Sequence, residues 1–196
     1  MSNYREEYQR WLDSPTLTEC EWEELNAISE DEKEIENRFY APLEFGTAGL
    51  RGTMKIGLHN MNVHVIRHAT QAFADVIRTE GPEAMKKGIA IAHDCRHHSR
   101  EFAEEAACVM AANGIFVRIF DALRPTPELS FAVIHYGMAA GLNITASHNP
   151  KEYNGYKVYW SDGAQLPPQK AEALARRMAE TNANIFTCYK TCDFNE

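Results

Sequence analysis

The chain has 196 residues, of which 44% are hydrophobic and 24% charged, an ordinary globular composition with enough length for one hydrophobic core. The net charge of −8 is concentrated in residues 1–44, which carry 13 acidic and 4 basic residues and leave a balance of +1 for the remainder. The sequence contains no dense basic stripe and no long apolar run, which argues against nucleic-acid-binding and membrane-spanning proteins.

The amino terminus and the cysteines bear on the compartment. Residues 1–11 are polar and charged, whereas a secretion signal has a basic flank followed by an apolar run. The five cysteines are scattered and include no C-x-x-C pair, which is typical of neither a disulfide framework nor a zinc ribbon. We therefore expect a soluble, cytoplasmic protein with no nucleic-acid partner and no membrane partner.

Residues 1–44 are predicted to form an amino-terminal helical arm. Thr18 and Ser29 each begin an S/T-x-x-E sequence, which is the pattern of a capping box at the start of a helix. The acidic residues of this segment are expected to lie on solvated helical faces. From Phe45 onward the pattern changes, so we expect a separate domain over residues 45–196.

In this second segment, short β-branched runs alternate with amphipathic stretches. The predicted helices cover residues 62–79, 99–113, 126–136 and 167–181, and the predicted strands cover residues 88–92, 115–120, 141–146 and 156–160. Ser99 and Thr126 are the expected N-caps of their helices, and Tyr136 is expected to face inward. Asn154-Gly155 is a turn signal.

This alternation predicts an α/β fold, a three-layer α/β/α domain with a mainly parallel mixed sheet. The carboxyl ends of parallel strands meet at one edge of a sheet, where ligands bind. We therefore expect the loops of residues 93–100, 123–127 and 147–154 to form one polar rim.

Ser147 and His148 stand side by side in the last of these loops. Neighbouring residues in an extended chain point to opposite sides, and no G-x-S-x-G sequence surrounds the serine, so a hydrolase dyad is disfavoured. A loop serine beside a turn-stabilising histidine is the alternative.

Two further segments suggest ligand chemistry. In "GTAGLRGTM", glycines at 46, 49 and 52 surround Arg51, whose guanidinium could bind an anion, although an ordinary turn has the same composition. In "HDCRHHSR", a metal site would use His93, Cys95, His97 and His98, but this spacing matches no standard zinc site. We favour Asp94 and Arg96 as a paired positioning element.

Taken together, "FGTAGLRG", D-x-R, "RPTP", "TASHNP" and "NGYK" resemble the first domain of the α-D-phosphohexomutase superfamily, the phosphoglucomutase and phosphomannomutase enzymes. The resemblance extends from about Phe45 to the last predicted helix. The forms "FGTAGLRG" and "NGYKVYW" are most similar to the branch that includes phosphoglucomutase acting also on pentose phosphates.

The resemblance implies that Ser147 carries a phosphoryl group and passes it to a sugar phosphate, with the sugar bisphosphate returning its other phosphate to the serine. It also implies that His148 positions and neutralises the phosphate, while Arg51 and Lys157 balance charge and assist proton transfer. On the residues alone, Lys157 could equally be an exposed strand residue between buried Tyr156 and Val158. The remaining candidates for positioning substrate or phosphate are Thr145, Asn149, Asp94 and Arg96.

The resemblance further implies Mg²⁺ as a cofactor, bound through the phosphate oxygen on Ser147, and glucose-1,6-bisphosphate as activator and intermediate. The acidic D-G-D-x-D-R loop that supplies the other metal ligands does not occur in this sequence. We therefore expect domains II–IV to be absent, the remaining mutase domains to be partners, and the isolated chain to be inactive. The expected substrate is a hexose phosphate, with pentose phosphate left open.

Two alternatives come from other functional classes. One is a freestanding phosphosugar-binding or regulatory module without turnover. The other is a metal-dependent hydrolase that uses the histidine-rich loop, for which tightly bound zinc would be diagnostic.

Overall fold

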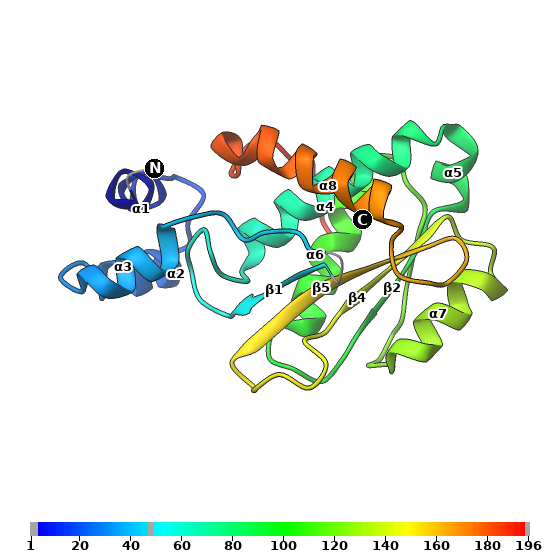
Figure 1. Cartoon of the computed structure of the whole chain (residues 1–196), viewed down its shortest axis with the longest axis horizontal. Helices are drawn as coiled ribbons and strands as arrows, with labels where there is room; N and C mark the ends of the chain where they lie inside the picture. Colours follow the sequence, from blue (N-terminus) through cyan, green and yellow to red (C-terminus); the bar gives the residue numbers. More distant parts are fainter. Residues whose placement is uncertain (1–3, 47–48, 195–196) are drawn as a thin grey trace.

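The computed structural model describes residues 4–46 and 49–194, within which a five-stranded mixed sheet forms the centre of the molecule (Figure 1). The strand order is β1-β5-β4-β2-β3. The strands are β1 (Leu50–Thr53), β2 (Ile89–His93), β3 (Val117–Ile119), β4 (Ala140–Ile144) and β5 (Tyr153–Trp160). The helices are α1 (Tyr4–Leu12), α2 (Glu19–Asn26), α3 (Glu32–Phe39), α4 (Val63–Thr79), α5 (Pro82–Lys87), α6 (Ser99–Ala112), α7 (Thr126–His135), α8 (Pro168–Thr181) and the 3₁₀ turn η1 (Asn182–Asn184).

The sheet is parallel on one side and antiparallel on the other. Strand β2 pairs in parallel with β3 and β4, whereas β5 pairs antiparallel with β4 and β1. The connection from Ile144 to Tyr153 is too short for a parallel crossover, which needs about a dozen residues or more, so β5 must return antiparallel. The predicted α/β class with a mixed sheet is confirmed.

Helices cover both faces of the sheet. Helix α6 packs against β2, β3 and β4, with α4 beside it and α8 against α4, while α7 packs against β2 and β4 on the opposite face (Figure 1). Strand β2 is buried along its whole length and alternates between the two layers. Ile89 and Ile91 belong to the large cluster under α4 and α6, whereas Ala90 and Ala92 face α7.

The helical arm is observed as predicted, and it shares the main hydrophobic core. Trp11, Leu25, Ile35 and Phe39 are fully buried in the same cluster as the inner faces of α4 and α6. The boundary between the arm and the domain, at residues 44 and 45, stays a prediction.

One of the two predicted capping boxes is confirmed. The Thr18 hydroxyl accepts from the Glu21 N–H, and the Glu21 carboxylate accepts from the Thr18 N–H. The prediction for Ser29 is wrong, because α3 begins two residues later and its N-cap is Asp31, whose carboxylate accepts from the Glu34 N–H. A carboxylate at that position satisfies the free N–H groups of the first turn equally well.

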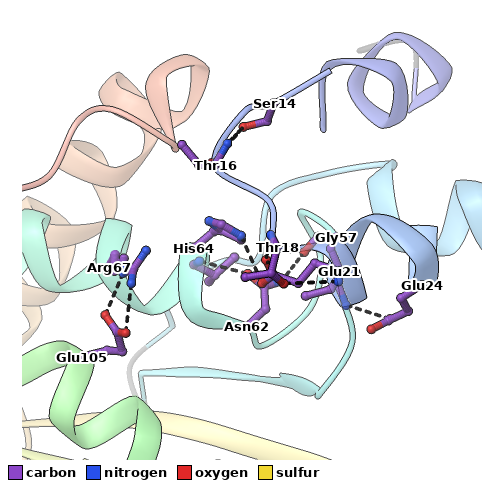
Figure 2. A network of polar contacts seen from close by, with 12 residues as sticks. Ser14, Thr16, Thr18, Glu21, Glu24, Gly57, Asn62, His64, Arg67 and Glu105 are labelled. Atoms are coloured by element: carbon purple, nitrogen blue, oxygen red, sulfur yellow. Dashed lines mark hydrogen bonds and ion pairs between the residues drawn. The ribbon is translucent and has the colours of Figure 1, made fainter. Parts of the chain in front are cut away.

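Glu21 and His64 join the arm to α4 (Figure 2). The Glu21 carboxylate lies 3.2 Å from Nε2 of His64, whose side chain is almost completely buried. Burial by itself raises the pKa of Glu21, but the contacts with His64 and Thr18 outweigh burial and lower the pKa to about 2. The carboxylate is thus held in its charged form at the contact between α2 and α4.

Three predictions about the edges of elements are corrected. The N-cap of α6 is His98 rather than Ser99, and α7 starts at Thr126 with Pro125 as its N-cap. In both cases the hydroxyl has a tertiary partner: Ser99 donates to Asp94 and Thr126 accepts from Asn143. Tyr136 is 54% exposed rather than turned inward.

Asn154 and Gly155 lie inside β5, so the predicted turn is misplaced. The turn falls at residues 151–152 instead. A Cβ atom at Gly155 would lie 2.6 Å from the Thr145 carbonyl oxygen, so glycine is needed here for close packing of the chains rather than for a turn. Helix α5 is not among the predicted helices, although it begins at Pro82 and proline favours the first position of a helix.

In the part of the chain that the structure describes, no helix is both long and apolar enough to cross a membrane.

Candidate active site

The three predicted loops meet at the edge of the sheet where β2 and β4 end. The Arg124 N–H donates to the His93 carbonyl at 3.0 Å, which joins the second loop to the first. The Arg96 guanidinium donates to the Ser147 carbonyl at 2.9 Å, which joins the first loop to the third. The predicted convergence on one rim is confirmed, and it follows from the parallel pairing of β2 with β4.

Ser147 occupies an exposed turn three residues beyond the end of β4. Its backbone is left-handed, with φ of +57°, a conformation that residues other than glycine adopt infrequently. Its N–H donates to the Thr145 hydroxyl at 3.0 Å. The surrounding contacts therefore hold Ser147 in a strained conformation, a feature that often accompanies function.

His148 is exposed beside Ser147, with 3.5 Å between its Nδ1 and the serine Oγ. A general base works from hydrogen-bond reach, about 2.6–3.2 Å. No carboxylate orients the His148 ring among the described residues, so the third member of a triad is missing from them. This arrangement does not suit a serine–histidine dyad.

Arg96 supports the Ser147 loop from behind. Among the described residues its guanidinium donates to four backbone carbonyls, those of Ser147, Asn149, Pro150 and Tyr153, at 2.6–2.9 Å. Its Nε also lies 3.3 Å from Asp94 Oδ2, so the predicted pair is present. Because these donors are used by the loop, Arg96 shapes the loop and adds positive charge beneath it.

Asp94 and Thr145 form the second support. The Asp94 carboxylate accepts from the Thr145 hydroxyl at 2.6 Å, and Thr145 in turn accepts from the Ser147 N–H. Thr145 is buried, so its hydroxyl serves the loop rather than an outside ligand. Two further residues contact this group, Ser99 and Asn154, which the sequence patterns assign to a helix cap and a turn. The signal that could have identified Asn154 is its polar side chain within a mostly buried strand.

Arg51 and Lys157 lie on one face of the sheet next to this loop. Arg51 is the register partner of Gly155, and Lys157 follows two residues later on β5, so the three positions face the same side. Arg51 Nη1 donates to Asn149 Oδ1 at 3.3 Å. Arg51 is exposed and Lys157 half-buried, between the buried Tyr156 and Val158.

The glycine-rich segment serves mainly to pack the chain. The N–H and carbonyl groups of Gly46 and Gly49 bond to each other, so these N–H groups are not free to bind an anion. A Cβ atom at Gly49 would lie 1.9 Å from the Tyr156 carbonyl oxygen. Residues 47 and 48 lie outside the described residues. Among the described residues of this segment, Arg51 contacts the rim through its hydrogen bond to Asn149.

Among residues 4–46 and 49–194, no group of three or more histidine, cysteine, aspartate or glutamate side chains is arranged to hold a metal ion. In the histidine-rich loop, the His93 ring contacts the Asp94 carbonyl and His98 contacts Glu101.

Comparison with known proteins identifies the family. Residues 42–184 match the family model described as phosphoglucomutase/phosphomannomutase, alpha/beta/alpha domain I. The chain belongs to this family. The match is to domain I, and it begins eight residues before the first strand of the sheet.

Several named relatives are similar to this domain I chain. Human phosphopentomutase is 39% identical over 184 residues, which cover 86% of this chain and 30% of the human protein. A probable phosphoribomutase of Schizosaccharomyces pombe is 40% identical over 84% of this chain and 28% of its own length. A Staphylococcus aureus phosphoglucomutase is 43% identical over 77% of this chain and 27% of its own length.

Among solved structures, a Thermus thermophilus protein assigned as a phosphomannomutase superimposes with a TM-score of 0.64 and 30% identity, covering 70% of this chain and 30% of that protein. The chain thus spans about 30% of the length of these relatives.

Proposed function

We propose that this chain is the phosphoserine-bearing catalytic domain of a sugar phosphomutase, which interconverts hexose 1-phosphate and hexose 6-phosphate through a sugar bisphosphate. The observation that carries the proposal is the conformation of Ser147, which is exposed at φ +57° on a loop whose carbonyls are held by Arg96. A loop whose backbone is fixed by Arg96 and whose serine side chain is exposed to solvent suits a residue that gives and receives a phosphoryl group.

In the proposed reaction, a sugar hydroxyl oxygen forms a bond to the phosphorus on Ser147 while the bond from phosphorus to serine Oγ breaks. The proton of the sugar hydroxyl passes, with assistance from Arg51 or Lys157, to the serine Oγ as its bond to phosphorus breaks. In the return transfer, Ser147 Oγ forms a bond to the phosphorus at the other end of the bisphosphate, the bond from that phosphorus to the sugar oxygen breaks, and the serine proton goes to the freed sugar oxygen. Phosphoryl transfer depends mainly on positioning and on charge stabilisation. A phosphoserine carries about −1.5 to −2 charge near neutral pH, which Arg51, Lys157 and His148 would balance.

Mg²⁺ fits only part of this site. A phosphate on Ser147 would offer oxygen, which Mg²⁺ prefers. The carboxylate that supports this loop, Asp94, already accepts from Thr145, Ser99 and the Arg96 N–H. Ser147 would therefore supply one ligand through its phosphate, the other ligands would come from outside these residues, and the ion would stabilise charge on the transferring oxygens.

The sugar is the finer part of the proposal. The relatives are named phosphopentomutase, phosphoribomutase and phosphoglucomutase, which supports a sugar phosphate substrate and leaves hexose and pentose as competing outcomes. Turnover of glucose 1-phosphate against ribose 1-phosphate, by a protein that joins this chain to the remaining family domains, would decide between them. We also propose a cytoplasmic location, with which the five free cysteines of the described residues agree.

The central test is phosphorylation of Ser147. The joined protein, incubated with labelled glucose-1,6-bisphosphate, should carry one stoichiometric label, which peptide mapping should place at Ser147. Ser147→Ala should remove both label and turnover. Label at another serine, or full activity in Ser147→Ala, contradicts the carrier role. Binding of sugar phosphate without any label would instead favour a binding or regulatory module.

A further inference from the structure

A chain of hydrogen bonds runs from buried Asn154 of β5, through the partly exposed Asp94 carboxylate, to the backbone of Ser147. Asn154 Nδ2 donates to Ser99 Oγ at 3.0 Å, and Ser99 Oγ donates to Asp94 Oδ1 at 2.7 Å. On the other carboxylate oxygen, the Thr145 hydroxyl donates to Asp94 Oδ2 at 2.6 Å and accepts from the Ser147 N–H at 3.0 Å. Two segments far apart in sequence therefore meet at one carboxylate.

The direction of each bond in this chain is determined by chemistry. A carboxylate can only accept hydrogen bonds, so Ser99 and Thr145 donate to Asp94. The Ser99 oxygen is then free to accept from the Asn154 amide, and the Thr145 oxygen to accept from the Ser147 N–H. A change at Asn154 thus alters the partners of Ser99 and, through Asp94, those of Thr145.

The Asn154 amide has a partner for each of its polar positions. Besides Ser99, its Nδ2 donates to the His97 carbonyl at 3.0 Å, and its Oδ1 accepts from the Gly155 N–H at 2.8 Å. An aspartate has nearly the same shape but no N–H group, so it would place an acceptor against the Ser99 and His97 oxygens.

Burial makes these contacts hard to replace. Asn154 and Ser99 are both 0% exposed, and Thr145 is 5% exposed. A buried polar group that loses its partner costs more than an exposed one, because water does not take the partner's place. The backbone of Thr145 is also bonded to β5, because its N–H donates to the Gly155 carbonyl.

We propose that Asn154 and Ser99 are positioning residues for phosphoryl transfer at Ser147, acting through Asp94 and Thr145 to hold Ser147 in its left-handed conformation. The link to phosphoryl transfer rests on the proposed function. Without this support, Ser147 would relax toward the usual negative φ and its Oγ would change direction. In-line transfer is sensitive to a displacement of about 1 Å.

The first test measures the Ser147 amide directly in the 196-residue chain. Amide hydrogen exchange, followed by NMR, should be roughly tenfold or more faster at Ser147 in Asn154→Asp and in Ser99→Ala, as expected when a hydrogen bond of ordinary strength is weakened. The matched control is Asn113→Asp, since Asn113 is buried and makes similar amide contacts to Gln71 and to the Val109 carbonyl.

This test has clear outcomes. Faster exchange at Ser147 in the two loop variants, with no change at Ser147 in the control, supports the proposal. Unchanged exchange at Ser147 in both loop variants overturns it. If Asn154→Asp does not fold, Ser99→Ala decides alone, because it removes a single oxygen atom.

The second test uses the joined protein and separates binding from transfer. Asn154→Asp and Ser99→Ala should lower kcat about tenfold or more while KM changes less than about threefold, because Ser147 orientation affects transfer rather than substrate binding. An unchanged kcat overturns the positioning role. If wild-type Ser147 takes no label from glucose-1,6-bisphosphate, the proposed function fails, whereas amide exchange still judges the positioning of Ser147.

Discussion

At the scale of single residues, the rim keeps two kinds of positive charge apart. Arg96 is mostly buried, and its N–H groups donate to the carbonyls of the Ser147 loop. Arg51 and Lys157 are accessible on the face of the sheet beside that loop. Removing Arg96 would therefore change the shape of the loop, while removing either of the others would mainly remove charge.

Arg51→Ala and Lys157→Ala should each lower kcat/KM of the joined protein by about 10²-fold or more, with little change in Tm. The reason is that both side chains would stabilise charge on the transferring phosphoryl group. With the described residues, the Arg51 side chain makes one long hydrogen bond, at 3.3 Å, and Lys157 is half-exposed. Arg78→Ala and Lys86→Ala, on the exposed ends of α4 and α5, serve as charge controls. Near-normal kinetics in Arg51→Ala or in Lys157→Ala would make that residue an ordinary surface residue.

Gly155→Ala should destabilise the fold by about 1–3 kcal/mol, because the added methyl would lie 2.6 Å from the Thr145 carbonyl oxygen and 3.0 Å from that of Leu50. Urea unfolding measures the free energy of unfolding. Gly46→Ala is the control, since within the described part of the chain its Cβ atom would meet nothing closer than the Gly49 carbonyl oxygen at 3.9 Å. Equal stability of the two variants would show that β5 can move away from Thr145.

At the scale of elements, the contact between α2 and α4 makes the arm sensitive to acid. The Glu21 pKa is lowered from 4.5 to about 2 in the folded chain. A lowered carboxyl pKa stabilises the fold above the unfolded value and loses that contribution as pH falls toward the folded value. The relevant window is therefore pH 4.5 to about 2.

In that window, wild type should lose stability relative to Glu21→Gln, by up to about 3 kcal/mol between pH 5 and pH 2, because the variant has no carboxylate to protonate. Urea unfolding at a series of pH values gives the difference. Glu83→Gln on exposed α5 controls for the loss of one negative charge. A difference between wild type and Glu21→Gln that is constant with pH would contradict the role of the contact with His64.

At the scale of the whole molecule, one hydrophobic core runs from the arm into the sheet. The cluster that holds Trp11 and Phe39 also holds Phe73 of α4 and Tyr156 of β5. A continuous core of this kind favours cooperative folding. The proposed phosphoryl transfer needs in addition metal ligands and a clamp for the distal phosphate of the substrate.

The 196-residue chain alone should therefore unfold cooperatively in urea but show no appreciable mutase turnover. We expect its described residues to offer Mg²⁺ at most the phosphate on Ser147 and to provide no clamp for the distal phosphate of the substrate, so the reacting hydroxyl would not be held in line. The assay follows conversion of glucose 1-phosphate to glucose 6-phosphate, with Ser147→Ala as control. Turnover of about 1 s⁻¹ or faster that depends on Ser147 would contradict this prediction.

The sequence by itself determined the helices whose signals are local. The helix predicted over residues 62–79 is observed as α4, which Asn62 caps and which ends at Thr79, and Thr18 forms its predicted capping box. These features depend on residues three or four positions apart, so they can be predicted without knowing the rest of the fold. The family could also be predicted from sequence, because "TASHNP" and the other motifs are each a short run of neighbouring residues.

Only the tertiary structure decided the partners of Asn154, Ser99 and Thr126. Each has a strong local preference for a turn or for a helix cap, but each instead makes a hydrogen bond outside that local motif. Asn154 bonds to Ser99, Ser99 bonds to Asp94, and Thr126 bonds to Asn143. The physical reason is the burial of Asn154, of Ser99 and of Asn143, the partner of Thr126. Once the sheet forms, a buried hydroxyl or amide without a partner costs about 1–3 kcal/mol, which exceeds the preference of an isolated turn.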